Sequence, residues 1–158
     1  MSNNDIRPLL MEQHARNLLE QRGIREEDVR QTLSATDSWQ LFHLNPVTGR
    51  RLAYVNSPKI TYWVEYAPEE GSYRIFNAYS HRMKILEGFN LPSKKEEESD
   101  WICAKCNVQL ALATVKLAYL DETFAADLPS CPVCQRVLVS EENATVKMAM
   151  AERMLEDK

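Results

Sequence analysis

Two short stretches decide the fold of the C-terminal third: WICAKC at residues 101–106 and LPSCPVC at residues 128–134. Each holds a Cys-x-x-Cys motif, and the 24 residues between the two motifs contain no further cysteine. Such a motif directs two sulfur atoms at one point, so two of them on facing hairpins can supply a tetrahedral four-sulfur site. We therefore predict a single metal site built from the only cysteines of the chain, Cys103, Cys106, Cys131 and Cys134.

The donor set suits Zn²⁺, and it also suits a mononuclear iron. The residue after each motif is expected in the left-handed backbone region, where a rubredoxin usually carries glycine. Here Asn107 and Gln135 occupy those positions, which favours structural zinc over a tuned iron centre. Four protein ligands also leave no open coordination position, which argues against metal catalysis. The alternative without a metal is two structural thiol pairs or a dithiol redox pair.

The residues around the motifs predict a small ribbon and a helix. Residues 113–128 alternate apolar and polar side chains in two runs, with a turn at Asp121-Glu122, which is typical of a β-hairpin. A short strand is expected at Val137–Val139. Ser140 is a good N-cap for a helix over residues 141–156, whose apolar stripe is expected at Ala144, Met148, Ala151 and Leu155. A module this small usually needs a staple such as a metal.

Charge divides the chain. Residues 1–95 carry 13 Lys+Arg and 11 Asp+Glu (+2), whereas residues 96–158 carry 6 and 12 (-6). The polar run over residues 92–100 lies at this change and is interpreted as a linker. We predict an α+β protein with an N-terminal domain at 1–91, a charged linker at 92–100 and the metal-binding ribbon with its C-terminal helix at 101–158.

The N-terminal domain is predicted to hold two helices followed by an antiparallel β-meander. Apolar residues spaced three or four apart indicate a helix that ends at Gly23, and a second helix follows with acids in its first turn. The β-branched and aromatic runs RLAYVN, KITYWVEY and YRIFNAYS predict the strands, with a hairpin loop at residues 67–72.

The C-terminal part resembles a family of small bacterial redox proteins, found mostly in anaerobes, with a rubredoxin-like or zinc-ribbon module. The likeness covers residues 101–158 and is carried by WICAKCNVQL, the strand VKLAYL, LPSCPVC and a helix ending in LEDK. The resemblance implies the same four cysteine ligands and a redox role.

The N-terminal part resembles a small domain of unknown function related to RelE/BrnT-like toxins. The matching residues are His14-Ala15-Arg16, Gln21 to Ile24, and Glu26 to Val29, followed by the meander. Some relatives of that fold cleave RNA, which implies His14, Arg22, His81 and Arg82 as candidates. The net charge of +2 in this half is lower than the strongly basic charge expected of a ribonuclease toxin.

Three functions follow as expectations. The first is a non-enzymatic, metal-binding accessory protein whose partner is another protein, such as a redox or metabolic enzyme. The second is rubredoxin-like electron transfer by mononuclear iron, and the third is RNA binding or cleavage by the N-terminal domain. The net charge of -4 argues against nucleic-acid partners. The lack of a secretory signal, of a membrane-spanning run and of disulfide-rich composition favours a cytoplasmic protein. The sequence does not indicate an oligomeric state.

Overall fold

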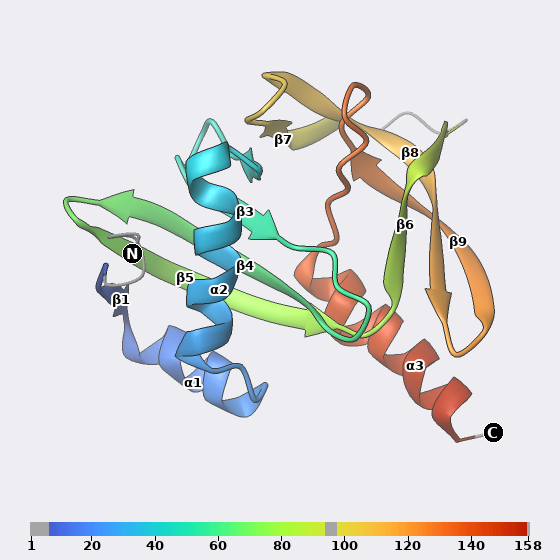
Figure 1. The fold of residues 1–158 in the computed structure, drawn as a ribbon, viewed down its shortest axis with the longest axis horizontal. Helices are drawn as coiled ribbons and strands as arrows, with labels where there is room; N and C mark the ends of the chain where they lie inside the picture. The colour runs from blue at the N-terminus through green and yellow to red at the C-terminus, as the bar shows by residue number, and fades with distance from the viewer. Residues whose placement is uncertain (1–6, 94–97, 158) are drawn as a thin grey trace.

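The structure is a computed structural model that describes residues 7–93 and 98–157. Along the chain, a first strand is followed by two helices and a 3₁₀ turn, then by eight strands, and finally by a π-helical segment and a last helix (Figure 1). The helical elements are α1 Gln13–Gln21, α2 Glu26–Thr36, a 3₁₀ turn at Asp37–Trp39, a π-helical segment at Asn143–Met148 and α3 Ala149–Glu156. The strands are β1 Leu9–Met11, β2 Phe42–Leu44, β3 Arg51–Tyr54, β4 Thr61–Glu69, β5 Ser72–His81, β6 Lys84–Pro92, β7 Glu98–Cys103, β8 Val108–Tyr119 and β9 Glu122–Ser130.

The predicted two-helix and meander arrangement is confirmed. Helix α1 ends because Gly23 takes a left-handed backbone (φ 68°), and Ile24 N then donates to Leu19 O. Strands β3, β4 and β5 are antiparallel neighbours, and the reversal between β4 and β5 needs only Glu70 and Gly71. Strand β1, which was not predicted, lies parallel to β5 at the edge of the sheet.

The predicted hairpin of the C-terminal part is also confirmed, and it is longer than expected. Strands β8 and β9 pair continuously from Tyr119↔Glu122 to Ala111↔Ser130. Leu120 and Asp121 form the turn with φ of 48° and 66°, which matches a two-residue hairpin turn with both central residues left-handed. The strand expected at Val137–Val139 is reduced to one bridge, Ser130↔Val137.

All nine strands belong to one sheet, which runs across the boundary placed at residues 92–100. The order is β1-β5-β4-β3-β2-β7-β8-β6. Strands β7 and β6 pair with successive parts of one edge of β8, and β9 pairs with its opposite edge. Strand β2 joins β7 through His43↔Cys103 and Leu44↔Ile102, and β6 pairs with β8. The linker prediction is therefore wrong for Pro92, which belongs to β6, and for residues 98–100, which belong to β7, while residues 94–97 lie outside the described residues. Backbone pairing with a distant strand overrides the polar composition of this segment.

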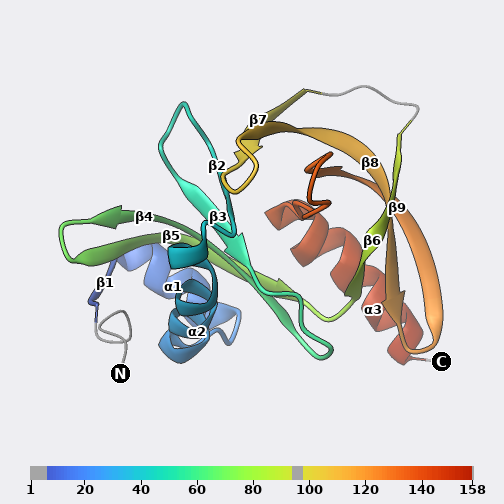
Figure 2. The ribbon, with the colours of Figure 1, turned by 45° about the horizontal axis from the view of Figure 1, so that its top comes forward.

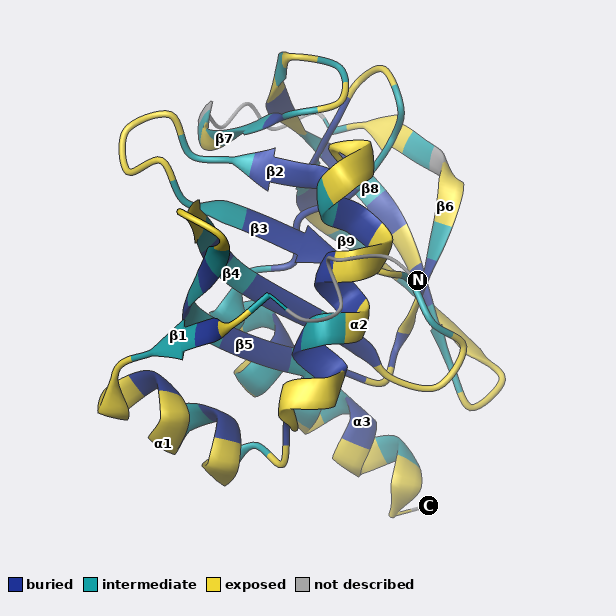
Figure 3. Ribbon diagram, turned by 60° about the vertical axis from the view of Figure 1, so that its left-hand side comes forward, coloured by how far each residue is buried: buried dark blue, intermediate teal, exposed yellow. Residues whose placement is uncertain are grey.

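The sheet of the N-terminal part is covered on both faces. Helices α1 and α2 lie against one face, where Val29, Leu33 and Val64 belong to one core cluster. The opposite face contributes Tyr54 and Trp63 to a second cluster, completed by side chains of β8, β9 and the C-terminal helix (Figures 2 and 3). This double coverage explains why Trp63 and Val64, adjacent in sequence, are both fully buried.

The C-terminal helix begins as predicted, because Ser140 Oγ accepts from Asn143 N at 3.2 Å. Its inward face differs from the expected stripe. Ala144 and Met148 are buried, and the third buried residue is Glu152 rather than Ala151 or Leu155. Within the described residues, no helix combines the length and apolar character that crossing a membrane requires.

Candidate metal centre

The four predicted cysteines come together where the turn between β7 and β8 lies beside the turn that follows β9. Cys103 is the last residue of β7, Cys106 lies in the turn before β8, and Cys131 and Cys134 follow β9. Their sulfur atoms all lie within 4.8 Å of one another. All four are free thiols, and Cys103 and Cys131 are buried while Cys106 and Cys134 are partly exposed.

The spacing of the sulfur atoms fits a tetrahedral metal. With a metal–sulfur bond of about 2.3 Å, the edges of a four-sulfur tetrahedron measure about 3.8 Å. Cys103 Sγ and Cys134 Sγ are 3.7 Å apart, whereas a disulfide would bring them to about 2.05 Å. The cluster is therefore compatible with one metal ion held by four thiolates.

The two Cys-x-x-Cys turns have the same backbone construction. Asn107 N donates to Cys103 O at 2.7 Å, and Gln135 N donates to Cys131 O at 2.9 Å. Both donors lie in the left-handed region, with φ of 56° for Asn107 and 66° for Gln135. The sequence thus places two non-glycine residues where a Cβ is unfavourable, at a cost of about 1 kcal/mol or more for each.

Backbone amides and burial act in opposite directions on the thiols. Burial raises the pKa of the Cys103 thiol to about 12. Burial also opposes ionisation of Cys131, but hydrogen bonds from the amides of Cys134 and Val133, each 3.4 Å from Cys131 Sγ, and from the thiols of Cys134 and Cys106 together lower that pKa. Four thiolates this close repel one another, so a divalent cation is the natural counterpart of the ionised cluster.

The second Cys-x-x-Cys turn is tied directly to the N-terminal part by Arg136. Arg136 Nη2 donates to Leu41 O at 3.3 Å and Tyr54 O at 3.0 Å, and the guanidinium lies 4.3 Å from the Tyr54 ring centroid. Tyr54 Oη in turn accepts from Val137 N at 3.0 Å. These contacts were not predicted from the sequence, in which the available signal is a cation, Arg136, two residues after the last cysteine of the turn.

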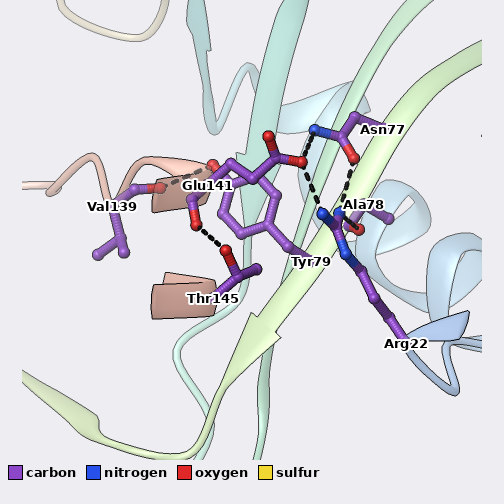
Figure 4. Close-up of polar contacts among 7 residues, drawn as sticks. All are labelled: Arg22, Asn77, Ala78, Tyr79, Val139, Glu141 and Thr145. Atoms are coloured by element: carbon purple, nitrogen blue, oxygen red, sulfur yellow. Dashed lines mark hydrogen bonds and ion pairs between the residues drawn. The ribbon is translucent and has the colours of Figure 1, made fainter. Parts of the chain in front are cut away.

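Two of the RNA-cleavage candidates lie near Glu141: His14 in the first turn of α1, and Arg22 directly after its last residue (Figure 4 shows Arg22). Arg22 donates to Asn77 Oδ1, Ala78 O and Glu141 Oε2 at 2.8–2.9 Å, so its guanidinium joins α1, β5 and the start of the C-terminal helix. His14 is exposed and lines a hollow of about 290 Å³ that also contains Glu141. Arg22 is thus engaged in a contact between the two parts.

The other two candidates, His81 and Arg82, lie elsewhere. Trp63 Nε1 donates to His81 Nε2 at 3.0 Å, so the proton on the His81 ring sits on Nδ1 and is donated to Met83 O at 2.8 Å. His81 is buried, and Arg82 pairs with Glu152 and Glu156 of α3. A buried ring with both nitrogens hydrogen-bonded cannot contact a substrate in this conformation. RNA cleavage stays a prediction, and the four candidate residues do not come together at one site.

The burial of His81 has a consequence for stability against pH. Burial lowers its pKa from 6.5 to about 4. Between pH 6.5 and 4, His81 is protonated in the unfolded chain but stays neutral in the folded chain. The free energy of unfolding should therefore fall by about 1.4 kcal/mol per pH unit over this interval. We expect urea unfolding of His81→Gln, although weaker at pH 7, to lose less stability than the wild type over this interval.

Using the difference between the two proteins removes the contribution of groups they share. Among these are the cysteine cluster and His43, whose pKa burial also lowers to about 4. Parallel losses of stability in the two proteins would show that His81 takes up its proton in the folded state as readily as in the unfolded one.

Comparison with known proteins gives one match. A family model described as a domain of unknown function (DUF7479) matches residues 99–158, the stretch that carries the four cysteines and the C-terminal helix. No curated protein and no solved structure matches the chain. The C-terminal part of the chain is therefore similar to a family whose function is open, and the metal centre has to be interpreted from its own geometry.

Proposed function

We propose that this chain is a metal-binding accessory protein, in which zinc held by Cys103, Cys106, Cys131 and Cys134 stabilises a ribbon-like module that binds a protein partner. The observation that carries the proposal is the convergence of four free thiols within 4.8 Å on two matching backbone turns. Bound zinc would supply a covalent-like cross-link between the turn after β7 and the turn after β9.

Two features support a structural role: the site has no open coordination position, and its turns contact the N-terminal part. Four protein sulfurs complete a tetrahedral zinc, so no position remains for water or substrate. The same turns hold Arg136 against Leu41 O and Tyr54 O, so fixing the turns also fixes the contact with the N-terminal part. These features favour an assembly role over catalysis.

Electron transfer by iron is the second candidate, and a specific observation favours it. Two amides donate to Cys131 Sγ, and such bonds tune the reduction potential of iron–sulfur centres. Cys106 and Cys134 are partly exposed, which would bring the centre close to a redox partner.

Metal analysis of protein purified without oxygen separates the candidates. We expect a colourless protein with one zinc per chain, and we expect chelation to lower its unfolding temperature. A reddish protein with one iron per chain, whose visible absorption bleaches on reduction, would replace the zinc proposal by electron transfer. Protein that binds neither metal, and whose stability a chelator leaves unchanged, would remove both.

A further inference from the structure

The outer edge of β9 presents a regular row of backbone groups, and within the described residues most of them lie beyond the short contact made at Pro129 and Cys131. Leu138 N donates to Pro129 O, and Cys131 N donates to Arg136 O, both at 2.8 Å. Pro129 and Cys131 therefore direct their backbone groups away from β8. Because this direction alternates along a strand and the pairing with β8 is continuous, Thr123, Ala125 and Asp127 direct theirs outward as well.

The part of the chain that the structure describes covers only the end of this edge. After the bridge at Val137 it turns at Ser140 into the C-terminal helix, so residues 123–127 are left beyond the covered portion. Among the described residues, β8 is the only strand paired with β9 along this stretch. Both ribbon views place β9 at the margin of the molecule (Figures 1 and 2). An open edge of this kind is a template for another strand.

An apolar groove runs beside the same edge. It has a volume of about 310 Å³ between the β8–β9 hairpin and the C-terminal helix. On β9 the groove is lined by Phe124, Ala126 and Leu128, which alternate with the residues whose backbone groups point outward, and also by Asp127. Its apolar lining comprises Met83, Leu117, Phe124, Ala126, Leu128, Met148 and Ala151. A strand added to β9 would place every second side chain into this groove.

The solvent side of the groove extends along the helix. Lys147 and Ala151 line the groove, and Met150 and Met154 lie three residues further on from each, which places them on the adjoining helix face. Met150 is 55% and Met154 66% exposed, so this extension is apolar and open to solvent. Methionine surfaces adapt to differently shaped side chains.

Charge indicates the kind of strand that fits. Strand β9 carries Glu122 and Asp127 and no basic residue, and residues 96–158 together carry 6 Lys+Arg against 12 Asp+Glu. Among the residues that the structure describes, Lys147 is the one cation lining the groove. A second copy of the chain would bring two acidic edges together, whereas a basic segment would be attracted.

We propose that β9 and the adjoining groove bind an extended, basic peptide segment of a protein partner by strand addition. The segment carries apolar residues at alternate positions, which enter the groove, and lysine or arginine between them, one of which lies opposite Asp127. This inference rests on the proposed function, since it names the partner surface of the accessory protein.

The variant that tests it is Ala125→Pro, made in the full-length, metal-loaded protein. Proline removes the N–H that Ala125 directs outward and places its ring in the path of an added strand, while the bonds to β8 do not use that N–H. Ala125→Ser is the matched control, because it keeps the N–H. The probe is a short fluorescent peptide alternating valine and lysine, measured by anisotropy.

We expect the wild type and Ala125→Ser to bind this peptide, and Ala125→Pro to bind it about tenfold or more weakly. A peptide of the same composition with its lysines in one block, and one alternating valine and glutamate, should both bind poorly. Equal binding by Ala125→Pro or by the block peptide would overturn strand addition, and so would no binding at all. Sedimentation showing a dimer that Ala125→Pro dissociates would assign the edge to a second copy instead.

Metal content is measured on the same samples, which keeps the two proposals apart. One zinc per chain without peptide binding would overturn the docking site and leave the metal function standing. Peptide binding by protein that holds no metal would do the reverse.

Discussion

Replacing Cys131 with serine should abolish stable metal binding and lower the stability of the whole chain by several kcal/mol. A serine hydroxyl is a poor ligand for zinc, and structural zinc contributes on the order of 10 kcal/mol to small zinc modules. Cys131 is buried, and its side chain belongs to the same core cluster as Tyr54 and Trp63. The damage is therefore not confined to the turn that carries the ligand.

The measurements are metal content, circular dichroism and limited proteolysis, with Thr123→Ser as a control of similar chemistry on the exposed face of β9. We expect one cooperative unfolding transition, because the sheet and the larger core include both parts of the chain. Proteolysis that removes residues 101–140 and leaves residues 7–81 intact would show two independent units. An unchanged variant would show that the metal is incidental.

Replacing Glu152 with alanine should cost about 3–5 kcal/mol, the usual range for removing one partner of a buried charged contact. Glu152 is 3% exposed, and its carboxylate accepts from Arg82 N at 2.7 Å and Met83 N at 2.8 Å. It also lies 3.5 Å from the Arg82 guanidinium. Alanine would leave two amides unpaired in the turn between β5 and β6, where Met83 is buried.

Urea unfolding followed by tryptophan fluorescence provides the test. Glu152→Gln keeps the size of the side chain and one acceptor oxygen, so we expect it to recover more than half of the loss. Arg153→Ala, on the exposed face of the same helix, should change stability by less than about 0.5 kcal/mol. If Glu152→Ala matched Arg153→Ala, the two amides would have found other acceptors, and the helix would dock through its apolar residues alone.

The sequence predicted the features whose signals are local. Two Cys-x-x-Cys motifs fix their own turns, and Gly23, Ser140 and the β-branched runs mark helix and strand boundaries through interactions between close neighbours. The cysteine cluster and the N-terminal helices and meander were found in this way.

The features that the sequence did not reveal depend on partners far along the chain. The pairing of His43 with Cys103 spans 60 residues, and nothing in either segment specifies the other. Glu152 looks like a solvent-facing charge on a helix until the amides of Arg82 and Met83 are placed against it. The polar run at 98–100 was interpreted as a linker for the same reason, because the strand that pairs with it cannot be identified from composition.

The double-sided coverage of the N-terminal sheet bears on how the protein is made. During synthesis the strands that carry Tyr54, Trp63 and Tyr79 leave the ribosome before the segments that cover them, since Val137, Val139 and Met148 lie later in the sequence. Until then the nascent chain holds a stack of aromatic rings, with Tyr54 and Trp63 centroids 4.1 Å apart in the finished protein, on an uncovered face. The N-terminal half therefore leaves the ribosome with this apolar face uncovered, and the face is buried only when the C-terminal segments have followed.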